Sequence, residues 1–416
     1  MNIIEVDKQY VAGTYNRFPV AIVKGKEAEC WDADGKRYID MGTGIGVTAF
    51  GYADEDWQAA VTAQLGAVQH TSNLYYTEPC AKLAEALCTR TGMSKVFFAN
   101  SGAEANECAI KVARKYAADK KGDDHHVIVT LQNSFHGRTL TTLAATGQDH
   151  FHTLFQPLTP GFVHTPANDL AAFEKVLDEN KVAGVLFECV QGEGGVLNLT
   201  DEFVLGMATL CKEKDVLLMV DEVQTGNGRT GKLYAFEHYG IIPDVVTTAK
   251  GLGGGLPIGA CMMSEKCATV LGYGDHGSTY GGNPVCCAGA LNVISRIDDA
   301  LLAGVAEREA YVRRRLAGFT VTGRGLMLGI ETQKPVGEVI AACREKGVLV
   351  LSAKTKVRLL PALNIPMERL AEAMDVIVEA LKKGVCYAEI ESKAFSETAG
   401  FFPGRNRGAH RPGRRL

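Results

Sequence analysis

The chain has 416 residues, 46% of them hydrophobic and 22% charged, with a net charge of -4. This length allows a large core and more than one domain, and the composition is that of an ordinary globular protein. No basic stripe suggests a nucleic-acid partner, no apolar run is long enough to span a bilayer, and the first ten residues do not resemble a signal peptide. We therefore expect a cytoplasmic protein that acts on neither nucleic acid nor membrane.

The twelve cysteines include no Cys-x-x-Cys pair, so we expect no zinc site. Several lie inside apolar segments, as Cys189 and Cys211 do, which favours buried, reduced thiols. An acidic and histidine-rich run at residues 123–126 could suggest a metal, but a solvated loop explains it better.

The N-terminal stretch is typical of short strands and turns. Residues 28–32 and 37–40 flank an Asp-Gly turn and predict a β-hairpin. Helical patterns follow over 57–68 and 79–89, and a short strand is expected at 95–99. The glycine-rich segment 42–46 is a weak dinucleotide motif because no apolar strand and helix frame it.

A helix is expected to begin directly after the strand at 95–99. Ser101 and Glu104 have the spacing of a capping box, and Gly102 and Ala103 leave their backbone N–H groups accessible. A strand followed by such a helix is a good phosphate site, although a plain capped helix explains the pattern equally well.

Three buried strands end at charged residues. The run 183–187 ends at Glu188, the run 216–220 ends at Asp221, and the run 245–248 is followed by Lys250 and four glycines within five residues. With crossover-length helical patterns between them, these strands predict an α/β fold with a mostly parallel sheet and helices on both faces. The polar loops, including residues 133–139, then meet at the carboxyl edge of the sheet, where ligands bind.

The remaining segments predict the domain organisation. A polar turn at 277–284 precedes a long helix, a charged helical stretch reaches residue 315, and short strands follow at 326–330, 348–350 and 357–360. A last helix begins at Pro366, with Gly384 as its end signal. We expect residues 51–290 to form a large domain, residues 1–50 and 291–385 a smaller α+β domain, and residues 386–416 a disordered basic tail.

A lysine and an acid at neighbouring strand ends suggest a specific chemistry. Pyridoxal 5'-phosphate needs a lysine that can form a Schiff base, an acid for its pyridine nitrogen and a helix N-terminus for its phosphate. Arginines bind the carboxylates of amino-acid substrates.

From Tyr15 to Lys383 the chain resembles a class III (subgroup II) pyridoxal-phosphate-dependent aminotransferase of fold type I, and within that class the acetylornithine aminotransferases. The resemblance rests on these stretches: HTSNLYYTEP, FFANSGAEANE, FHGRT, QGEGGV, DEVQTGNGRTG, TTAKGLGGGLPIGA and GSTYGGNP. It implies a large domain with a seven-stranded type of sheet, a homodimer with shared active sites, and ping-pong transfer of the δ-amino group of N2-acetylornithine to 2-oxoglutarate in arginine biosynthesis.

The resemblance also implies residue roles. Lys250 matches the lysine that binds the cofactor and moves the proton, and Asp221 matches the partner of the pyridine nitrogen. The other cofactor positions are the phosphate cradle Gly102 and Ala103, the stacking ring Phe135, Glu222 beside Asp221, Val223 beneath the ring, Gln224 at its phenolic oxygen, and Thr279, which reaches the phosphate of the neighbouring subunit.

The substrate positions implied by the resemblance are Arg138 for a carboxylate, Ser278, and the pair Arg358 and Glu193. Arg358 would take a carboxylate of glutamate and be masked by Glu193 when acetylornithine is bound.

Some residues depart from the family pattern. Cys189 replaces the usual Pro, Tyr52 replaces the usual His after Gly51, and the stretch RLLPAL differs slightly from the common form. None of these changes removes a catalytic group.

Other functions are open to test. Another ω-amino donor (succinylornithine, ornithine, 4-aminobutyrate or a lysine precursor) is the first alternative. A nicotinamide-dependent oxidoreductase would leave Lys250 without a role, and the intact Lys250 and Asp221 argue against a catalytically inactive binding protein.

Overall fold

A seven-stranded sheet carries the site, in a computed structural model that describes residues 2–382. Its strand order is β4-β12-β11-β10-β7-β5-β6. The strands are β4 (Lys95–Ala99), β5 (Val127–Leu131), β6 (Phe162–Thr165), β7 (Val182–Phe187), β10 (Leu217–Asp221), β11 (Val245–Thr248) and β12 (Gly259–Met263). The strands from β11 to β6 run parallel, and β12 pairs antiparallel with both β11 and β4. The predicted mostly parallel sheet is confirmed, with β6 and β12 as strands that the sequence pattern did not reveal.

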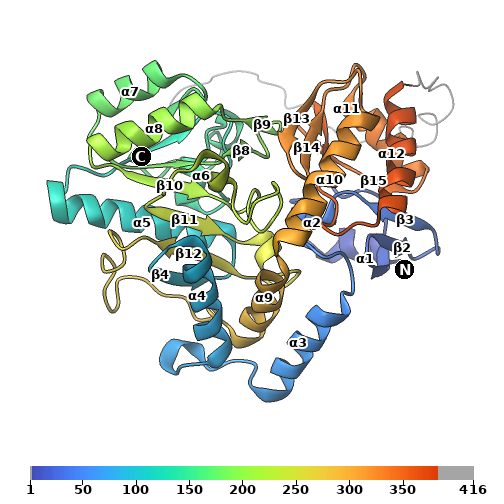
Figure 1. Cartoon of the computed structure of the whole chain (residues 1–416), viewed down its shortest axis with the longest axis horizontal. Coiled ribbons are helices and arrows are strands. Elements are labelled where there is room, and N and C mark those ends of the chain that lie inside the picture. Colours follow the sequence, from blue (N-terminus) through green and yellow to red (C-terminus); the bar gives the residue numbers. More distant parts are fainter. Residues whose placement is uncertain (1, 383–416) are drawn as a thin grey trace, which may run out of the picture. The chain divides into compact units, whose positions relative to one another are not determined.

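Helices cover both faces of this sheet, as expected (Figure 1). Successive residues of β10 divide between two apolar clusters, because side chains alternate along a strand. Leu217 and Met219 belong to the cluster that contains the buried face of α5 (Gly102–Lys121). Leu218 and Val220 belong to the cluster on the other face, which includes residues of α4 (Glu78–Thr91), α7 (Leu170–Glu179), α8 (Asp201–Glu213) and α9 (Pro284–Arg296).

Two smaller sheets bring the two ends of the described chain together. The first has the order β1-β2-β3-β15, in which the predicted hairpin of β2 (Glu29–Asp32) and β3 (Arg37–Asp40) is joined in parallel by β15 (Val348–Leu349). The second has the order β13-β14-β17-β16. The remaining strands here are β1 (Ile22–Lys26), β13 (Val321–Arg324), β14 (Met327–Ile330), β16 (Leu351–Ala353) and β17 (Lys356–Leu359).

The helices beside these sheets are α10 (Asp299–Arg315), α11 (Val336–Glu345) and α12 (Met367–Lys382), which lie near β3 and β15 in Figure 1. One face of α12 is buried, as its sequence pattern predicts, through Leu370, Met374, Ile377 and Leu381. Residues up to Leu381 form one compact unit. The domain boundaries at 50 and 290 stay predictions, and those for Gly384 and the basic tail lie outside the described residues.

The first ten residues differ from expectation. They form a helix, α1 (Ile3–Tyr10), where strands and turns were predicted. Asn2 caps it through the backbone N–H of Glu5, and the Glu5 carboxylate accepts the N–H of Asn2, so a reciprocal capping box decided this segment. The remaining helical and strand segments are α2 (Thr43–Gly46), α3 (Glu55–Ala67), α6 (Leu140–Ala145), β8 (Val190–Gln191), β9 (Leu197–Asn198), η1 (Ser72–Leu74), η2 (Asp149–Phe151), η3 (Ala235–Tyr239) and η4 (Lys250–Leu252).

Candidate active site

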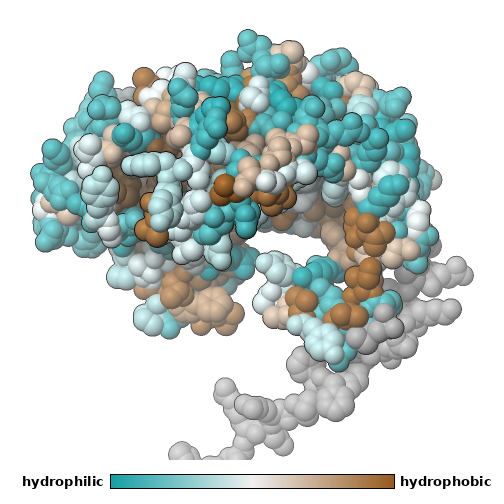
Figure 2. Space-filling view, turned by 90° about the horizontal axis from the view of Figure 1, so that it is seen from below, coloured by the Kyte–Doolittle hydropathy of each residue, from teal (hydrophilic) through white to brown (hydrophobic). Residues whose placement is uncertain are grey.

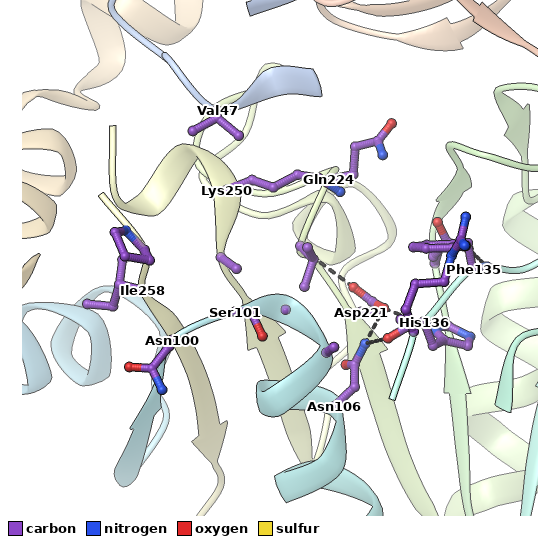
Figure 3. Close-up of a pocket in the computed structure, with 18 of the residues that line it drawn as sticks. Val47, Asn100, Ser101, Asn106, Phe135, His136, Asp221, Gln224, Lys250 and Ile258 are labelled. Atoms are coloured by element: carbon purple, nitrogen blue, oxygen red, sulfur yellow. Dashed lines mark hydrogen bonds and ion pairs between the residues drawn. The ribbon is translucent and has the colours of Figure 1, made fainter. Parts of the chain in front are cut away.

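A cavity of about 460 Å³ lies at the carboxyl edge of β10 and β11, beside the N-terminus of α5 (Figure 3). Eight of the predicted site residues line it: Gly102, Ala103, Phe135, Arg138, Asp221, Val223, Gln224 and Lys250. They come from four separate stretches of the sequence. The fold therefore collects at one sheet edge the groups that the sequence analysis placed at strand ends.

Asp221 is held by three hydrogen bonds at the end of β10. Its Oδ2 accepts from Asn106 Nδ2 and from His136 Nδ1, each at 2.8 Å, and its Oδ1 accepts the backbone N–H of Val223 at 3.0 Å. Figure 3 shows the carboxylate between the first two side chains. Because Asp221 is only 3% exposed, these donors take the place of water and fix the direction of its carboxylate.

Asn106 and His136 are site residues that sequence reasoning did not assign individually. The 133–139 loop was a candidate contact, but nothing in the sequence showed which of its side chains would reach Asp221. Asn106 lies one turn into α5 and looked like an ordinary helix residue. Its Oδ1 accepts a hydrogen bond from Thr247 Oγ1 at 2.7 Å, which fixes the orientation of its amide.

Lys250 follows β11 and faces the same cavity. Asp221 pairs with Thr247 in the parallel ladder, so the lysine stands three residues beyond the neighbour of the acid. Lys250 has a backbone φ of 45°, a left-handed conformation that is uncommon outside glycine and concentrates at functional sites. Burial lowers the pKa of its amine, while Glu193 and Asp221 act in the opposite direction. A less basic amine is more often neutral and nucleophilic.

The first residues of α5, Gly102 and Ala103, line the cavity and have no side chain or only a methyl group. A Cβ on Gly102 would lie 2.6 Å from Val223 Cγ1, so only glycine fits this contact without displacement. The predicted capping box is half formed: Ser101 Oγ accepts the N–H of Glu104 at 3.2 Å, whereas the Glu104 carboxylate accepts the N–H of Asn100 at 2.7 Å. The exposed donors of the first turn remain available to an anion.

Glu188, which follows β7, supports the loop that carries Phe135. Its carboxylate accepts the backbone N–H of Phe135 at 3.0 Å and that of Gly192 at 3.3 Å. Burial raises the pKa of Glu188 to about 7, against the opposing effect of His136. The sequence showed an acid at a strand end here but did not indicate this supporting role.

Arg358 and Glu193 form an ion pair that contacts the cavity through Gln224, one of the lining residues. The guanidinium Nη1 is 2.5 Å from Glu193 Oε1 and 3.2 Å from Gln224 Oε1, and Gln224 Nε2 donates to Glu193 at 3.3 Å. Burial opposes ionisation of Glu193, but the Arg358 charge and hydrogen bond keep the pKa of its carboxyl below the usual value. Arg358 is 3% exposed, so its charge is neutralised locally.

Five predicted residues do not line the cavity: Glu193 and Arg358, which reach it only through Gln224, and Glu222, Ser278 and Thr279. Glu222 is fully buried, and its carboxylate accepts from Thr225 Oγ1 and from the N–H of Phe236 at 2.8 Å. Its side chain therefore joins two loops outside the cavity lining, and the expected cofactor contact of Glu222 stays a prediction. Ser278 Oγ accepts from Asn100 Nδ2 at 3.0 Å, and Thr279 is exposed.

Within residues 2–382, no group of three or more His, Cys, Asp or Glu side chains is arranged to hold a metal ion. None of the helices in the same range is long and apolar enough to cross a membrane.

Comparison with known proteins decides the family. The family model for aminotransferase class-III matches residues 10–381. The chain belongs to the class-III aminotransferases. It is 48% identical to the acetylornithine aminotransferase of Haemophilus ducreyi, over 92% of this chain and 98% of that protein. It is 44% identical to the acetylornithine aminotransferase of Aquifex aeolicus, over 89% of this chain and all of the relative (100%).

Solved structures agree with this class-III assignment. The N-acetylornithine aminotransferase of Stenotrophomonas maltophilia K279a matches with a TM-score of 0.80 and 34% identity, over 91% of this chain and 98% of that one. The ornithine aminotransferase of Toxoplasma gondii ME49 matches with a TM-score of 0.87 and 32% identity, over 91% and 94% of the two chains.

This class-III aminotransferase is a pyridoxal-phosphate-dependent enzyme, and its cavity fits the cofactor. The ring nitrogen requires an acid, and the Asp221 carboxylate is held in place by three donors. The aldehyde requires an amine, and the pKa of Lys250 is lowered. The phosphate requires a helix N-terminus, and α5 begins at Gly102, where a side chain would clash with Val223.

Proposed function

We propose that the enzyme transfers the δ-amino group of N2-acetylornithine to 2-oxoglutarate, giving N-acetylglutamate 5-semialdehyde and glutamate, in arginine biosynthesis. One observation carries the substrate assignment: the cavity wall has one arginine without an acidic partner, Arg138, and a second arginine, Arg358, lies behind the wall residue Gln224, where it is masked by an acid. A donor with one carboxylate and a neutral acetyl group needs one cation, whereas a dicarboxylate acceptor needs two. The identity to acetylornithine aminotransferases supports the same choice.

Each cofactor contact follows from the position of its residue. Pyridoxal phosphate supplies an electrophilic aldehyde and a ring that accepts electrons. Asp221 would hold the proton at the ring nitrogen, with His136 and Asn106 keeping the carboxylate in place. Gly102 and Ala103 would donate backbone N–H groups to the phosphate, and Gln224 would donate to the phenolic oxygen. Phe135 and Val223 would pack on the two ring faces and exclude water.

Lys250 would both bind the aldehyde and carry a proton. As a neutral amine, Lys250 would take a proton from the substrate carbon that bears the amino group and would return it later.

Arg358 and Glu193 would select between the two substrates. The paired state presents a neutral wall to the acetyl group, and opening of the pair presents a cation to the second carboxylate of 2-oxoglutarate. Arg138 and Ser278 would serve the other end of either substrate. This switch would break the ion pair and the Gln224–Glu193 hydrogen bond, and the Glu193 side chain, which is 31% exposed, can turn toward solvent.

A homodimer would complete the site. Thr279 is exposed and lies outside the cavity of its own chain, as expected for a hydroxyl that serves a neighbouring subunit's phosphate. Large aromatic side chains stand exposed near Thr279 in the sequence, namely Tyr273 at 111% and Tyr280 at 62%. Hydrophobic groups also reach the surface at several places in Figure 2. The described cysteines are all free thiols, which fits the proposed cytoplasmic location.

A panel of amino donors with 2-oxoglutarate tests the substrate, comparing kcat/KM for N-acetylornithine, succinylornithine, ornithine and 4-aminobutyrate. Preference for N-acetylornithine is expected, and preference for another donor would overturn the assignment in favour of that ω-aminotransferase. Purified enzyme should show a visible absorption band that borohydride removes and that Lys250→Ala lacks. A wild-type protein without this band after added cofactor would contradict the roles given to Lys250 and Asp221.

A further inference from the structure

Arg138 lines the cavity with a guanidinium that has no ionic partner. Among residues 2–382, no carboxylate lies within ion-pair distance of it and its side chain makes no hydrogen bond. It is exposed, and a free arginine side chain at a surface samples many rotamers. A carboxylate ligand would then have to fix the side chain on binding, and this ordering weakens affinity.

Two aromatic rings contact this guanidinium. Its central carbon is 4.3 Å from the ring centroid of Phe151 and 5.6 Å from that of Phe135. The two rings meet edge to face at 6.0 Å with an interplanar angle of 63°, and His150 packs on Phe151 at 3.9 Å. Such distances are within the range in which a cation is attracted to an aromatic face.

The segment that carries Phe151 is tied to the loop that carries Arg138. Phe151 ends the short helix η2, and its backbone N–H donates to the carbonyl of Gln148 at 3.0 Å. The Gln148 side chain, 7% exposed, donates to the carbonyl of Ser134 at 3.0 Å. The ring and the guanidinium are therefore held by one connected piece of structure, although Phe151 itself does not line the cavity.

We propose that Phe151 is a positioning residue for substrate binding, which stacks on Arg138 and holds its guanidinium ready for a substrate carboxylate. Stacking uses the face of the guanidinium and leaves its in-plane N–H groups free to bind a carboxylate with two hydrogen bonds. Part of the ordering cost is thereby met before substrate arrives. This inference rests on the proposed role of Arg138.

The test measures binding of glutarate, a five-carbon dicarboxylate that cannot react, to the holoenzyme by titration calorimetry. Phe151→Leu keeps an apolar side chain but removes the ring, and should raise the Kd by about three- to tenfold. Phe151→Tyr keeps the ring and should bind as wild type does. Phe155→Leu is the matched control: the same substitution in the same loop, at an exposed ring with no contact to Arg138, should leave the Kd unchanged.

Steady-state kinetics adds a readout that a merely structural role would not give. In Phe151→Leu the KM for the donor should rise while kcat at saturation stays close to wild type, with an unchanged melting temperature. Phe151→Met is a second ring-free variant if Phe151→Leu folds poorly. A fall in kcat with an unchanged KM would overturn the proposal.

A double-mutant cycle separates this proposal from the proposed function. In an Arg138→Gln background, Phe151→Leu should have no further effect on the Kd of glutarate. If it weakens binding by the same factor in both backgrounds, Phe151 does not act through Arg138 and the proposal fails. If Arg138→Gln itself leaves the Kd unchanged, the carboxylate role of Arg138 is refuted, and the positioning role falls with it. If Arg138→Gln binds glutarate more weakly than wild type but Phe151→Leu binds it with the wild-type Kd, only the role of Phe151 is refuted.

Discussion

The guanidinium of Arg358 lies 2.5 Å from the carboxylate of Glu193, and Gln224 contacts both side chains. The pair thus joins the β16–β17 hairpin to the QGEGGV loop and to the strand end that carries Asp221. It places a concealed positive charge beside the cavity, available only when Glu193 moves.

Replacing Glu193 with Ala should change the two half-reactions differently. The unmasked Arg358 disfavours the neutral acetyl group, so KM for N-acetylornithine should rise by about tenfold, since an uncompensated buried charge costs at least 1–2 kcal/mol. KM for 2-oxoglutarate should fall or stay the same. The measurement is single-turnover kinetics of each half-reaction.

Glu202→Ala, at an exposed position of α8, serves as the control for that substitution and should affect neither half-reaction. Equal effects of Glu193→Ala on both half-reactions would contradict the switch.

Replacing His136 with Ala should weaken the hold on Asp221. A hydrogen bond to a charged group contributes about 1.5–3 kcal/mol, so cofactor affinity or kcat/KM should fall by about ten- to a hundredfold. Equilibrium dialysis of the cofactor and initial rates measure the two effects. His125→Ala, at a partly exposed histidine outside the site, should behave as wild type. A His136→Ala enzyme with normal cofactor affinity and rate would show that Asn106 and the Val223 N–H suffice.

A methyl group at Gly102 should impair cofactor binding. The new Cβ would meet Val223 Cγ1 at 2.6 Å, so Gly102→Ala must displace either Val223 or the first turn of α5. We expect the Kd of pyridoxal phosphate to rise at least tenfold. The Kd is measured by titrating the cofactor and recording the visible absorption band. Gly66→Ala is the matched control, because nothing lies within 4 Å of a Cβ there. If the two variants bind cofactor equally well, Gly102 is not part of a close-fitting cradle.

Glu222 should make stability depend on pH. Burial raises the pKa of Glu222 from 4.5 to about 7. Because the folded-state pKa is raised, its favourable contribution is complete below about pH 4.5 and is lost as pH rises through about 7. The shift corresponds to about 3 kcal/mol of unfolding free energy across this window.

Glu222→Gln cannot titrate, yet its amide can donate to Thr225 and its oxygen can accept from Phe236. Denaturant unfolding at several pH values should therefore show a smaller decline between pH 4.5 and 7.5 in this variant than in wild type. Glu202→Gln should keep the wild-type slope. An identical slope in wild type and Glu222→Gln would show that Glu222 is already ionised at low pH in the folded protein.

The sequence predicted the elements whose signals are local. Apolar runs that end at Asp221 and before Lys250 indicated neighbouring parallel strands, and the register of Asp221 with Thr247 confirms this arrangement. The buried face of α12 likewise followed from helical spacing. Strand β12 was missed because it begins at Gly259, only four residues after the glycine run that ends at Gly255, and glycine is a weak strand signal.

The contacts around the site depended on tertiary structure. Asn106 reaches Asp221 only because α5 packs across β10 and β11, and no spacing within α5 reveals that. Glu222 was expected at the cofactor from the family resemblance, and only the structure shows that its buried carboxylate accepts hydrogen bonds from Thr225 and Phe236. The sequence did not indicate a role for Phe151, because its contact with Arg138 is formed only in the folded structure.

Strand β3 has a consequence for how the chain folds during synthesis. Its second neighbour in the sheet, β15, is encoded at Val348–Leu349, far later in the sequence than Arg37–Asp40. Until the ribosome has produced nearly the whole described chain, the N-terminal hairpin presents an open strand edge that can pair with other chains. Late closure of such a distant pairing is slow, so the hairpin is the segment that a chaperone has most reason to protect while the chain is made.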